Sequence, residues 1–308
     1  MTKKGTIKRV SEKVYLLGDP YYQVYLVRGE SCALVESGLS YTVPNVVSQL
    51  AELEISPEEI RYLVIPHAHF DHACGTPGLQ RAFPHLQIVA STVAARVFAK
   101  EKVVTGHFIE DRAVVETLLG KGILEHYDTT FQPPTTISVD IVMNEGDVLD
   151  LGGGCNLSFY LTPGHSPCSM SIYLPLGEVL FPSDCLGYQF SNNDMFPMYF
   201  SGFADYVNSI KKLSGIETSV LAFPHELLLM DKGKIREFMH RSLEVTEKVH
   251  DFIIQAYQNS RTYEDISREL FDRFYLDGLA NQSEANIKLC TDLLVRRSLE
   301  AENIAYTK

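Results

Sequence analysis

The sequence lacks any uninterrupted apolar segment long enough to span a membrane. No run of about 18 apolar residues occurs in its 308 residues. The basic start MTKKGTIKRV is not followed by the apolar stretch of a secretory signal. Low-complexity segments and short repeats are also missing. We therefore expect a cytoplasmic, globular chain that does not associate with membranes.

Cysteine pairs and positive charge are scarce as well. The six cysteines include no CxxC pair, which favours reduced thiols over a disulfide framework. The 27 Lys and Arg residues are outnumbered by 39 Asp and Glu, giving a formal net charge of −12. Proteins that bind nucleic-acid phosphates usually carry a basic face, so no nucleic-acid partner is expected. The 45% hydrophobic content is ample for a large core.

Short β segments alternate with helical patterns over the first 230 residues. Apolar and alternating runs predict strands at 13–18, 22–29, 32–37, 62–66 and 86–91, and several more between 137 and 226. Helical periodicity is found at 43–53, 77–83, about 101–130, 235–257, 262–274 and 283–300. Two β-rich halves with interspersed helices predict an α/β fold, a four-layer αββα sandwich. We expect a main domain over 1–231, with a helical insertion at about 101–130, and a helical C-terminal cap over 232–308.

The stretch VIPHAHFDHACG places four potential metal ligands directly after an apolar run. Alternate positions of an extended segment face the same side, so His67 and His69 can bind one ion. Asp71 and His72 follow a turn and can point to a neighbouring ion. The other interpretation is a surface loop of polar side chains that bond to each other.

Three further ligand-type residues stand at the ends of apolar runs. His165 follows FYLTPG, Asp184 follows VLFPS, and His225 follows VLAFP. Strand ends are where loops gather functional side chains on a rigid scaffold. Each metal needs ligands from outside the first motif, and these three residues are the candidates.

Taken together, the residues resemble the metallo-β-lactamase-fold hydrolase superfamily over about residues 8–230. Its marks are His-x-His-x-Asp-His, a later Gly-His, a bridging Asp and a late His. The resemblance implies that His67, His69 and His165 hold one metal, that Asp71, His72 and His225 hold a second, and that Asp184 bridges both. It implies two divalent metal ions as cofactors, with zinc first and iron or manganese as alternatives.

The bridging Asp is similar to that of glyoxalase II, the lactonases and the RNA-processing nucleases rather than to the β-lactamases, which lack a carboxylate there. The helical insertion and tail look like the caps of glyoxalase II and of the quinolone-signal response protein, a thioesterase-like member. Two positions depart from the pattern: Ser183 stands where Gly is usual, and Glu226 follows His225 where Gly is usual. The segment SDCLGYQFSNND contains no Lys or Arg, which argues against a glutathione thioester.

The reaction that follows is hydrolysis of a small molecule. Two ions would share a water whose pKa falls from about 15.7 to near 7, and the hydroxide would attack an ester, thioester, lactone or phosphodiester. Asp71 and Asp184 are the expected catalytic residues. Glu36 or Ser37 could orient the histidines, whereas Cys74 and Cys185 are expected to be packing residues.

The substrate pocket is expected to draw on residues 187–203, with Tyr188, Phe196 and Tyr199 as candidate contacts. Core packing is the alternative role for these aromatic side chains. The glycines at 152–154 lack the Lys-Ser/Thr of a phosphate loop and predict a hairpin turn.

Two other functions remain open from the sequence. One is a mononuclear iron dioxygenase of the same fold, because two His and one carboxylate suit Fe(II). The other is a signalling protein that acts mainly through its helical region, whose apolar residues could cover the core, form a homodimer or meet a partner.

Overall fold

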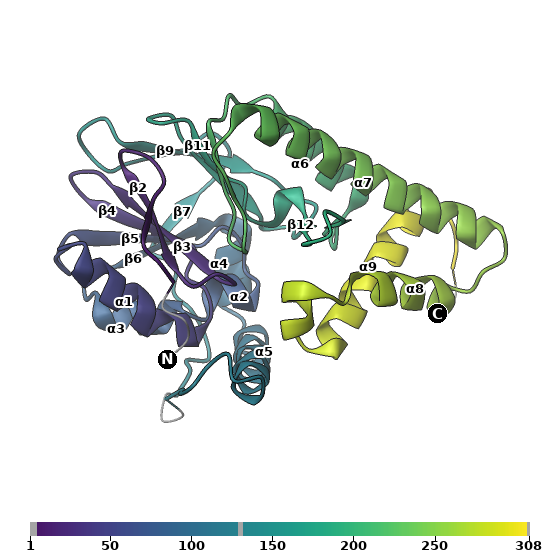
Figure 1. Cartoon of the computed structure of the whole chain (residues 1–308), viewed down its shortest axis with the longest axis horizontal. Helices are drawn as coiled ribbons and strands as arrows, with labels where there is room; N and C mark the ends of the chain where they lie inside the picture. Colours follow the sequence, from purple (N-terminus) through teal and green to yellow (C-terminus); the bar gives the residue numbers. More distant parts are fainter. Residues whose placement is uncertain (1–4, 129–131, 307–308) are drawn as a thin grey trace.

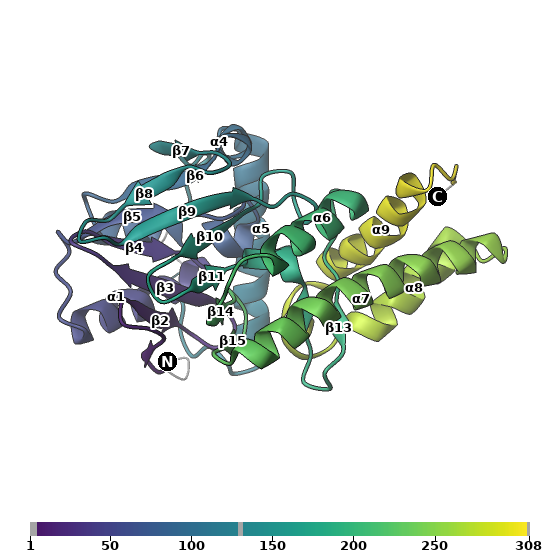
Figure 2. The same cartoon turned by 90° about the horizontal axis from the view of Figure 1, so that it is seen from above.

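A computed structural model describes residues 5–128 and 132–306. Two β-sheets pack face to face, and helices cover their outer faces (Figures 1 and 2). The predicted four-layer α/β sandwich is therefore confirmed. Apolar side chains from both sheets fill the space between them, among them Tyr25, Val64, Phe159 and Phe181.

The first sheet has the strand order β1-β2-β3-β4-β5-β6-β7. Its strands are β1 (Lys8–Arg9), β2 (Val14–Gly18), β3 (Gln23–Arg28), β4 (Cys32–Val35), β5 (Ile60–Val64), β6 (Gln87–Ser91) and β7 (Ile141–Met143). Strands β1 to β4 pair antiparallel, and β4 to β7 pair parallel. The parallel strands carry the helical connections, as parallel pairing requires a crossover.

The second sheet has the order β15-β14-β11-β10-β9-β8. Its strands are β8 (Val148–Asp150), β9 (Asn156–Leu161), β10 (Met170–Leu174), β11 (Val179–Phe181), β14 (Val220–Ala222) and β15 (Leu228–Leu229). Residues 152–154 connect the antiparallel strands β8 and β9, and all three glycines have positive φ. They form the hairpin turn that was predicted.

Helices α1 (Val43–Glu52), α3 (Thr76–Ala82), α4 (Thr92–Phe98) and α5 (Glu101–Gly120) bury apolar residues against the first sheet. Ser91 caps α4, since its hydroxyl accepts a hydrogen bond from the backbone N–H of Ala94. Helix α5 ends ten residues earlier than the expected insertion. Gly120 and Gly122, the latter at φ +66°, stop the helix there, and residues 129–130 of the expected insertion lie outside the described residues.

The C-terminal cap comprises α7 (Lys232–Gln258), α8 (Tyr263–Phe274), a 3-10 turn η3 (Asp277–Asn281) and α9 (Glu284–Ala301). The side chains of Asp231, Thr262 and Ser283 cap the three α-helices in turn. The cap and α6 (Phe203–Ser214) share one apolar cluster with the second sheet. The cap thus packs on the main body, and η3 contacts α5 of the predicted insertion.

Within residues 5–128 and 132–306, no helix combines the length and apolar character needed to cross a membrane.

Candidate metal centre

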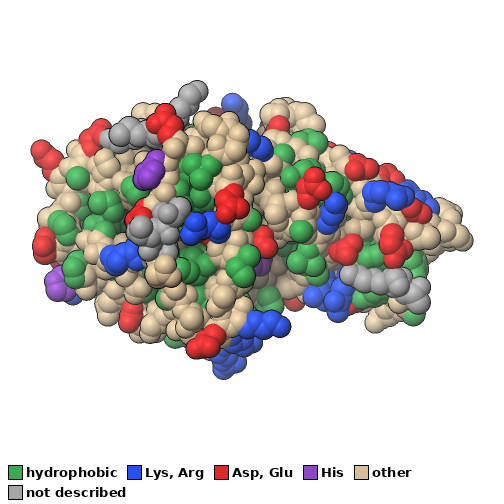
Figure 3. Space-filling view, turned by 90° about the horizontal axis from the view of Figure 1, so that it is seen from below, with side chains coloured by type: hydrophobic (Ala, Val, Ile, Leu, Met, Phe, Trp, Pro, Cys, Tyr) green, Lys and Arg blue, Asp and Glu red, His purple; other side chains and the backbone are tan. Residues whose placement is uncertain are grey.

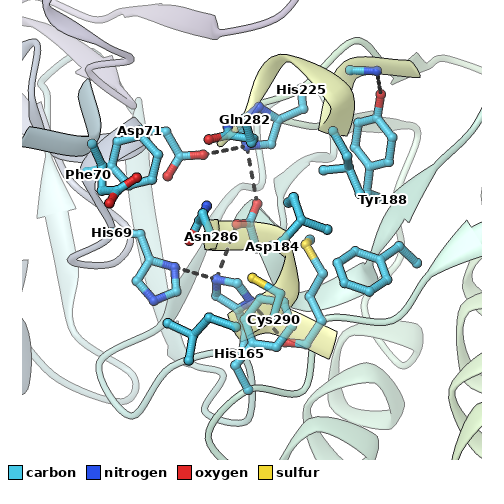
Figure 4. A pocket seen from close by; sticks show the side chains of 18 of the residues that line it. His69, Phe70, Asp71, His165, Asp184, Tyr188, His225, Gln282, Asn286 and Cys290 are labelled. Carbon is cyan, nitrogen blue, oxygen red and sulfur yellow. Dashed lines mark hydrogen bonds and ion pairs between the residues drawn. The ribbon is translucent and has the colours of Figure 1, made fainter. Parts of the chain in front are cut away.

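The seven predicted ligand residues come from four separate loops at strand ends. His67, His69, Asp71 and His72 follow β5, where α2 (Phe70–Ala73) begins directly after His69. His165 lies between β9 and β10, Asp184 lies in the 3-10 turn η2 (Ser183–Leu186) after β11, and His225 follows β14. The fold brings all of them together in two adjacent groups, and Figure 4 shows the five that line the cavity: His69, Asp71, His165, Asp184 and His225.

The first group contains His67, His69, His165 and Asp184. The Nε2 atom of His165 lies 3.1 Å from Nε2 of His67 and 2.9 Å from Nδ1 of His69. It also lies 3.2 Å from Oδ2 of Asp184. Three ring nitrogens and a carboxylate oxygen thus converge on one point, the arrangement that a bound cation requires.

The second group contains Asp71, His72 and His225. The Nε2 atoms of His72 and His225 each lie 3.6 Å from a carboxylate oxygen of Asp71. Asp184 faces this group too, with Oδ2 at 3.2 Å from His72 and Oδ1 at 3.7 Å from His225. Asp184 therefore stands between the two groups.

Burial and neighbouring charges prepare these side chains to bind cations. Burial, together with the surrounding histidines, holds the pKa values of His67 and His69 well below the usual value. Burial also lowers the pKa of His165. The neutral rings keep a lone pair for a metal. Burial raises the pKa of Asp184, but His72 and His165 more than offset this and hold it well below its usual value, so this carboxylate is ionised.

The donor set fits two divalent cations. Burial lowers the pKa of His72, yet Glu36, Asp184 and Asp71 together hold it well above the usual value. The negative charges of these three carboxylates would also stabilise a cation next to His72. Nε2 of His72 and Oδ1 of Asp184 are buried and have no hydrogen-bond partner among the residues that the structure describes. Buried polar atoms without partners are costly, and coordination of an ion would satisfy both.

The outward ring nitrogens are held in place by the backbone. Nδ1 of His165 lies 2.9 Å from the carbonyl oxygen of Met198, and Nδ1 of His225 lies 2.9 Å from that of Tyr21. A ring that donates from Nδ1 presents the lone pair of Nε2 to the site. These contacts fix both the orientation and the tautomer that metal binding needs.

Glu36 supports both groups, as the sequence had suggested. Its Oε2 lies 2.7 Å from Nδ1 of His72, and its Oε1 accepts a hydrogen bond from the hydroxyl of Ser183 at 3.1 Å. That hydroxyl lies 3.1 Å from Nδ1 of His67. Ser37 contributes less directly, by donating from Oγ to the carbonyl oxygen of His72 at 2.7 Å. The role of Ser183 was not foreseen, because the sequence marked it only as a departure from Gly.

A cavity of about 300 Å³ opens onto both groups. Its walls come from the loops of the two sheets, from α5 and from the C-terminal cap, and include Tyr22, His107, Tyr188, Phe196, Met198, Phe200, Gln282, Asn286, Cys290 and Leu293. Tyr188 and Phe196 thus line the cavity, as predicted. Tyr199 does not: it is fully buried in the core and its hydroxyl lies 2.9 Å from Oγ of Ser298. Proximity in sequence to the other two residues was misleading there.

Tyr188 connects three wall segments. Its hydroxyl donates to Oε2 of Glu226 and accepts a hydrogen bond from the backbone N–H of Gly278 at 3.1 Å. Both hydrogen-bonding directions of the phenol are therefore occupied, and the ring is what it offers to the cavity. The contribution of Gln282 and Asn286 was missed, since no local pattern shows which face of a C-terminal helix will meet the metal site.

The fold and the paired ligand groups define a protein with a buried His/Asp metal centre. The chain belongs to the metallo-beta-lactamase superfamily, whose family model matches residues 17–225. Solved structures agree in fold. A metallo-beta-lactamase from Cronobacter sakazakii superposes with a TM-score of 0.59 and 19% identity, over 84% of this chain and 98% of that chain. A subclass B3 metallo-beta-lactamase of Bradyrhizobium japonicum gives 0.59 and 18%, over 83% and 96%.

Two curated relatives are named as a flavo-diiron protein and a flavorubredoxin, whereas the solved structures above are metallo-beta-lactamases. A flavo-diiron protein from Clostridium acetobutylicum is 23% identical over 266 residues, covering 78% of this chain and 58% of that protein. An anaerobic nitric oxide reductase flavorubredoxin from Aliivibrio salmonicida is 27% identical over 176 residues, covering 57% of this chain and 29% of that protein. The chain therefore spans about a third to three fifths of the length of these two relatives.

Proposed function

We propose that this chain is a dinuclear metal-dependent hydrolase that cleaves an ester, thioester or lactone of a small molecule. The observation that carries the proposal is the position of Asp184. Its carboxylate faces His165 of the first group and both His72 and His225 of the second. A carboxylate so placed can hold two cations next to each other at the floor of one cavity.

Two divalent cations, with zinc first and iron or manganese as alternatives, would supply a water with a pKa near 7 and would polarise the substrate carbonyl. Asp71 is placed to accept a hydrogen bond from that water, because it lines the cavity and its side chain is 14% exposed. Asp184 stays ionised among the histidines, and its negative charge would offset part of the positive charge of the two cations. The backbone contacts of His165 and His225 keep the rings fixed throughout.

The cavity favours a carbonyl substrate over a phosphodiester. Its walls include aromatic and aliphatic side chains such as Phe196, Phe200 and Leu293, which exclude water and bind apolar groups. No Lys or Arg is among the described residues that line it. A phosphodiester would therefore meet positive charge at the two cations alone, with no cationic side chain to bind its remaining oxygens.

Metal analysis combined with a substrate panel tests the proposal. Purified protein should contain about two metal equivalents and hydrolyse members of a panel of esters, thioesters and lactones without consuming oxygen. Asp184→Asn and His69→Ala should each lower the hydrolysis rate by at least about 100-fold and reduce metal content. Exposed Asp251 and His85 provide the matched controls Asp251→Asn and His85→Ala, which should retain both. Full metal loading and activity in the two site variants would refute the proposal.

A redox reaction at two irons is the second candidate, and the names of the curated relatives favour it. It predicts two iron equivalents and consumption of oxygen or nitric oxide when a reduced flavin is supplied. Hydrolysis by a zinc-loaded protein that consumes neither gas would exclude it.

The mononuclear dioxygenase predicts one iron equivalent with oxygen consumption. The second group of Asp71, His72 and His225 supports two ions instead. A purely signalling role predicts no turnover of any panel member. The cavity beside the ligand groups supports an enzyme over that role.

A further inference from the structure

The described walls of the metal-site cavity have no basic side chain. Among residues 5–128 and 132–306, no Lys or Arg lines it, although the chain has 27 of them. Basic and acidic side chains are interspersed on the outer surface, as one face shows in Figure 3. The acidic wall residues Glu110 and Glu226 are engaged by the hydroxyls of Ser283 and Tyr188. An anionic group on the part of the substrate away from the metals would therefore lose its hydration without gaining a partner.

The body of the cavity is apolar. Phe196 and Phe200 lie 5.9 Å apart between ring centroids on one side, and Leu279, Ile287 and Leu293 of the C-terminal segment also line it. A volume of about 300 Å³ is at the small end of ligand cavities, which run from about 300 to 1,000 Å³. The space suits one compact ring or a short chain rather than a large conjugate.

Gln282 places a polar side chain in this apolar wall, and its hydrogen bonding is incomplete. Gln282 is only 8% exposed, and its Nε2 donates to the hydroxyl of Tyr22 at 3.0 Å. Its Oε1 is buried and has no hydrogen-bond partner among the residues that the structure describes. Gln282 lines the same cavity as Asp71 and His225, as Figure 4 shows. A buried carbonyl oxygen held in this way is a hydrogen-bond acceptor prepared for a donor that the protein itself does not supply.

We infer that the substrate is a compact, uncharged and largely apolar acyl compound that carries one hydrogen-bond donor, an O–H or N–H, which binds Oε1 of Gln282. This inference rests on the proposed hydrolysis and adds the substrate class to it. Gln282 is then a specificity-determining residue, supplied by the cap and fixed by Tyr22. A site built around a buried acceptor rejects an analogue that lacks the donor, because the acceptor is left unpaired.

Matched arylacetic esters with a single ring and a small leaving group provide a direct test. The probes are the methyl esters of 2-, 3- and 4-hydroxyphenylacetic acid, of the corresponding methoxyphenylacetic acids and, at the acetic carboxyl, of 4-carboxyphenylacetic acid. For at least one isomer, kcat/KM of the metal-loaded enzyme should be about 10-fold or more higher for the hydroxy ester than for its methoxy counterpart. The carboxy ester should be the poorest of the set.

Three variants identify the residue responsible. Gln282→Leu should abolish the preference for the hydroxy ester, because kcat/KM should fall about 10-fold further for the hydroxy ester than for its methoxy counterpart, whereas Gln282→Glu should keep the preference because an acceptor oxygen remains. Tyr22→Phe, which frees the amide but keeps the ring, should weaken the preference and supplies the test if Gln282→Leu does not fold. Equal losses for hydroxy and methoxy esters would mean a merely structural role and would overturn the inference.

Binding of amides that cannot be hydrolysed readily separates this inference from the proposed function. Calorimetry should show that the best hydroxyphenylacetamide binds wild-type protein about 10-fold or more tightly than its methoxy counterpart, and that Gln282→Leu removes the difference. If no ester is hydrolysed but this difference is present, the proposed hydrolysis fails and the recognition by Gln282 stands. If esters are hydrolysed without any preference, or the carboxy compound is preferred, the recognition fails and the hydrolysis stands.

Discussion

Oε1 of Glu36 accepts a hydrogen bond from the hydroxyl of Ser183, 3.1 Å away. The two residues are far apart in sequence, at the ends of strands in different sheets. Through this contact one carboxylate reaches both ligand groups: His72 directly, at 2.7 Å, and His67 through the Ser183 hydroxyl. Both residues have positive φ, 73° and 49° respectively, so the backbone adopts an unfavourable conformation to place them.

Replacing Glu36 with Gln is expected to weaken metal binding. The neutral amide keeps the shape but loses the charge that favours a cation at His72, and such supporting contacts are typically worth about 10- to 100-fold in metal affinity. Titration of demetallated protein against a chromophoric chelator measures the change. Glu54 is exposed and also has positive φ, so Glu54→Gln is the matched control, and equal affinities for the two variants would contradict the role given to Glu36.

Two substitutions of Ser183 distinguish the effect of its backbone strain from the effect of its hydroxyl. Ser183→Gly should relieve the left-handed conformation, by about 1 kcal/mol in the free energy of unfolding of the metal-free protein, while Ser183→Ala should not. Both variants should lower metal affinity by about 10-fold, because both remove the hydroxyl between Glu36 and His67. Urea unfolding in chelator and metal titration give the two readouts. Retention of wild-type affinity by both variants would show that the hydroxyl is dispensable.

Local spacing explains why the ligand groups could be predicted from the sequence. Four ligands fall in the six residues 67–72, and the others follow apolar runs, so strand alternation and strand ends fix their positions. The four layers follow from the same patterns. Gln282 lies some 200 residues beyond the first ligands, and its position depends on how η3 packs on α5 and how α9 packs on the other cap helices. Long-range packing of this kind leaves no periodic signal, which is also why Tyr199 was placed in the cavity and is found in the core.

Lys121 is expected to hold the cap closed over the cavity. Its Nζ donates to the carbonyl oxygen of Ala280 at 2.8 Å and to Oδ1 of Asn281 at 2.9 Å. Because the contacts are largely exposed, Lys121→Met should cost at most about 1 kcal/mol of overall stability. Opening of residues 277–283 should nevertheless become more frequent, so their backbone amides should exchange with deuterium about 2- to 5-fold faster. Lys102 is an exposed lysine at the other end of α5, the helix that Lys121 follows, and an equal effect of Lys102→Met would contradict this role.

Asp111 should make stability fall with rising pH. Burial raises its pKa above 3.8, although two hydrogen bonds from Ser40 and the nearby Arg112 act in the opposite direction. The native state then binds the proton more tightly than the unfolded chain, so the stability from this group is full below about pH 3.8 and is lost as the pH rises through the raised value. The Tyr127 hydroxyl lies near Asp111 as well: it is 2.8 Å from Oγ of Ser40, which donates a hydrogen bond to Asp111.

Asp111→Asn does not titrate and should remove this dependence. Unfolding free energies of the two proteins, measured in chelator between pH 3.5 and about 7, give a wild-type minus variant difference that should decrease with pH. Metal binding cannot contribute under these conditions. A difference that stays flat or increases would contradict the raised pKa of Asp111.

Gly164 is expected to be required for the position of His165. Its φ is +122°, and a Cβ there would lie 2.3 Å from backbone atoms of Tyr206 at the start of α6. Its carbonyl oxygen also accepts a hydrogen bond from the N–H of Ser201 at 2.9 Å. Gly164→Ala must move either α6 or the loop that carries His165, at a cost of about 2–4 kcal/mol. Metal bound per chain should fall, since the first group loses its geometry.

Two other glycines are suitable controls for that measurement. Gly122 has φ +66°, but no atom of the described residues lies within 4 Å of an added Cβ, so Gly122→Ala should cost only about 1 kcal/mol through the backbone. Gly106 lies inside α5, is equally open and has no positive φ, so Gly106→Ala should raise stability by about 0.5–1 kcal/mol. All three are compared by urea unfolding in chelator and by metal content after reloading. If Gly164→Ala bound as much metal as the two controls, close packing against Tyr206 would not be what places His165.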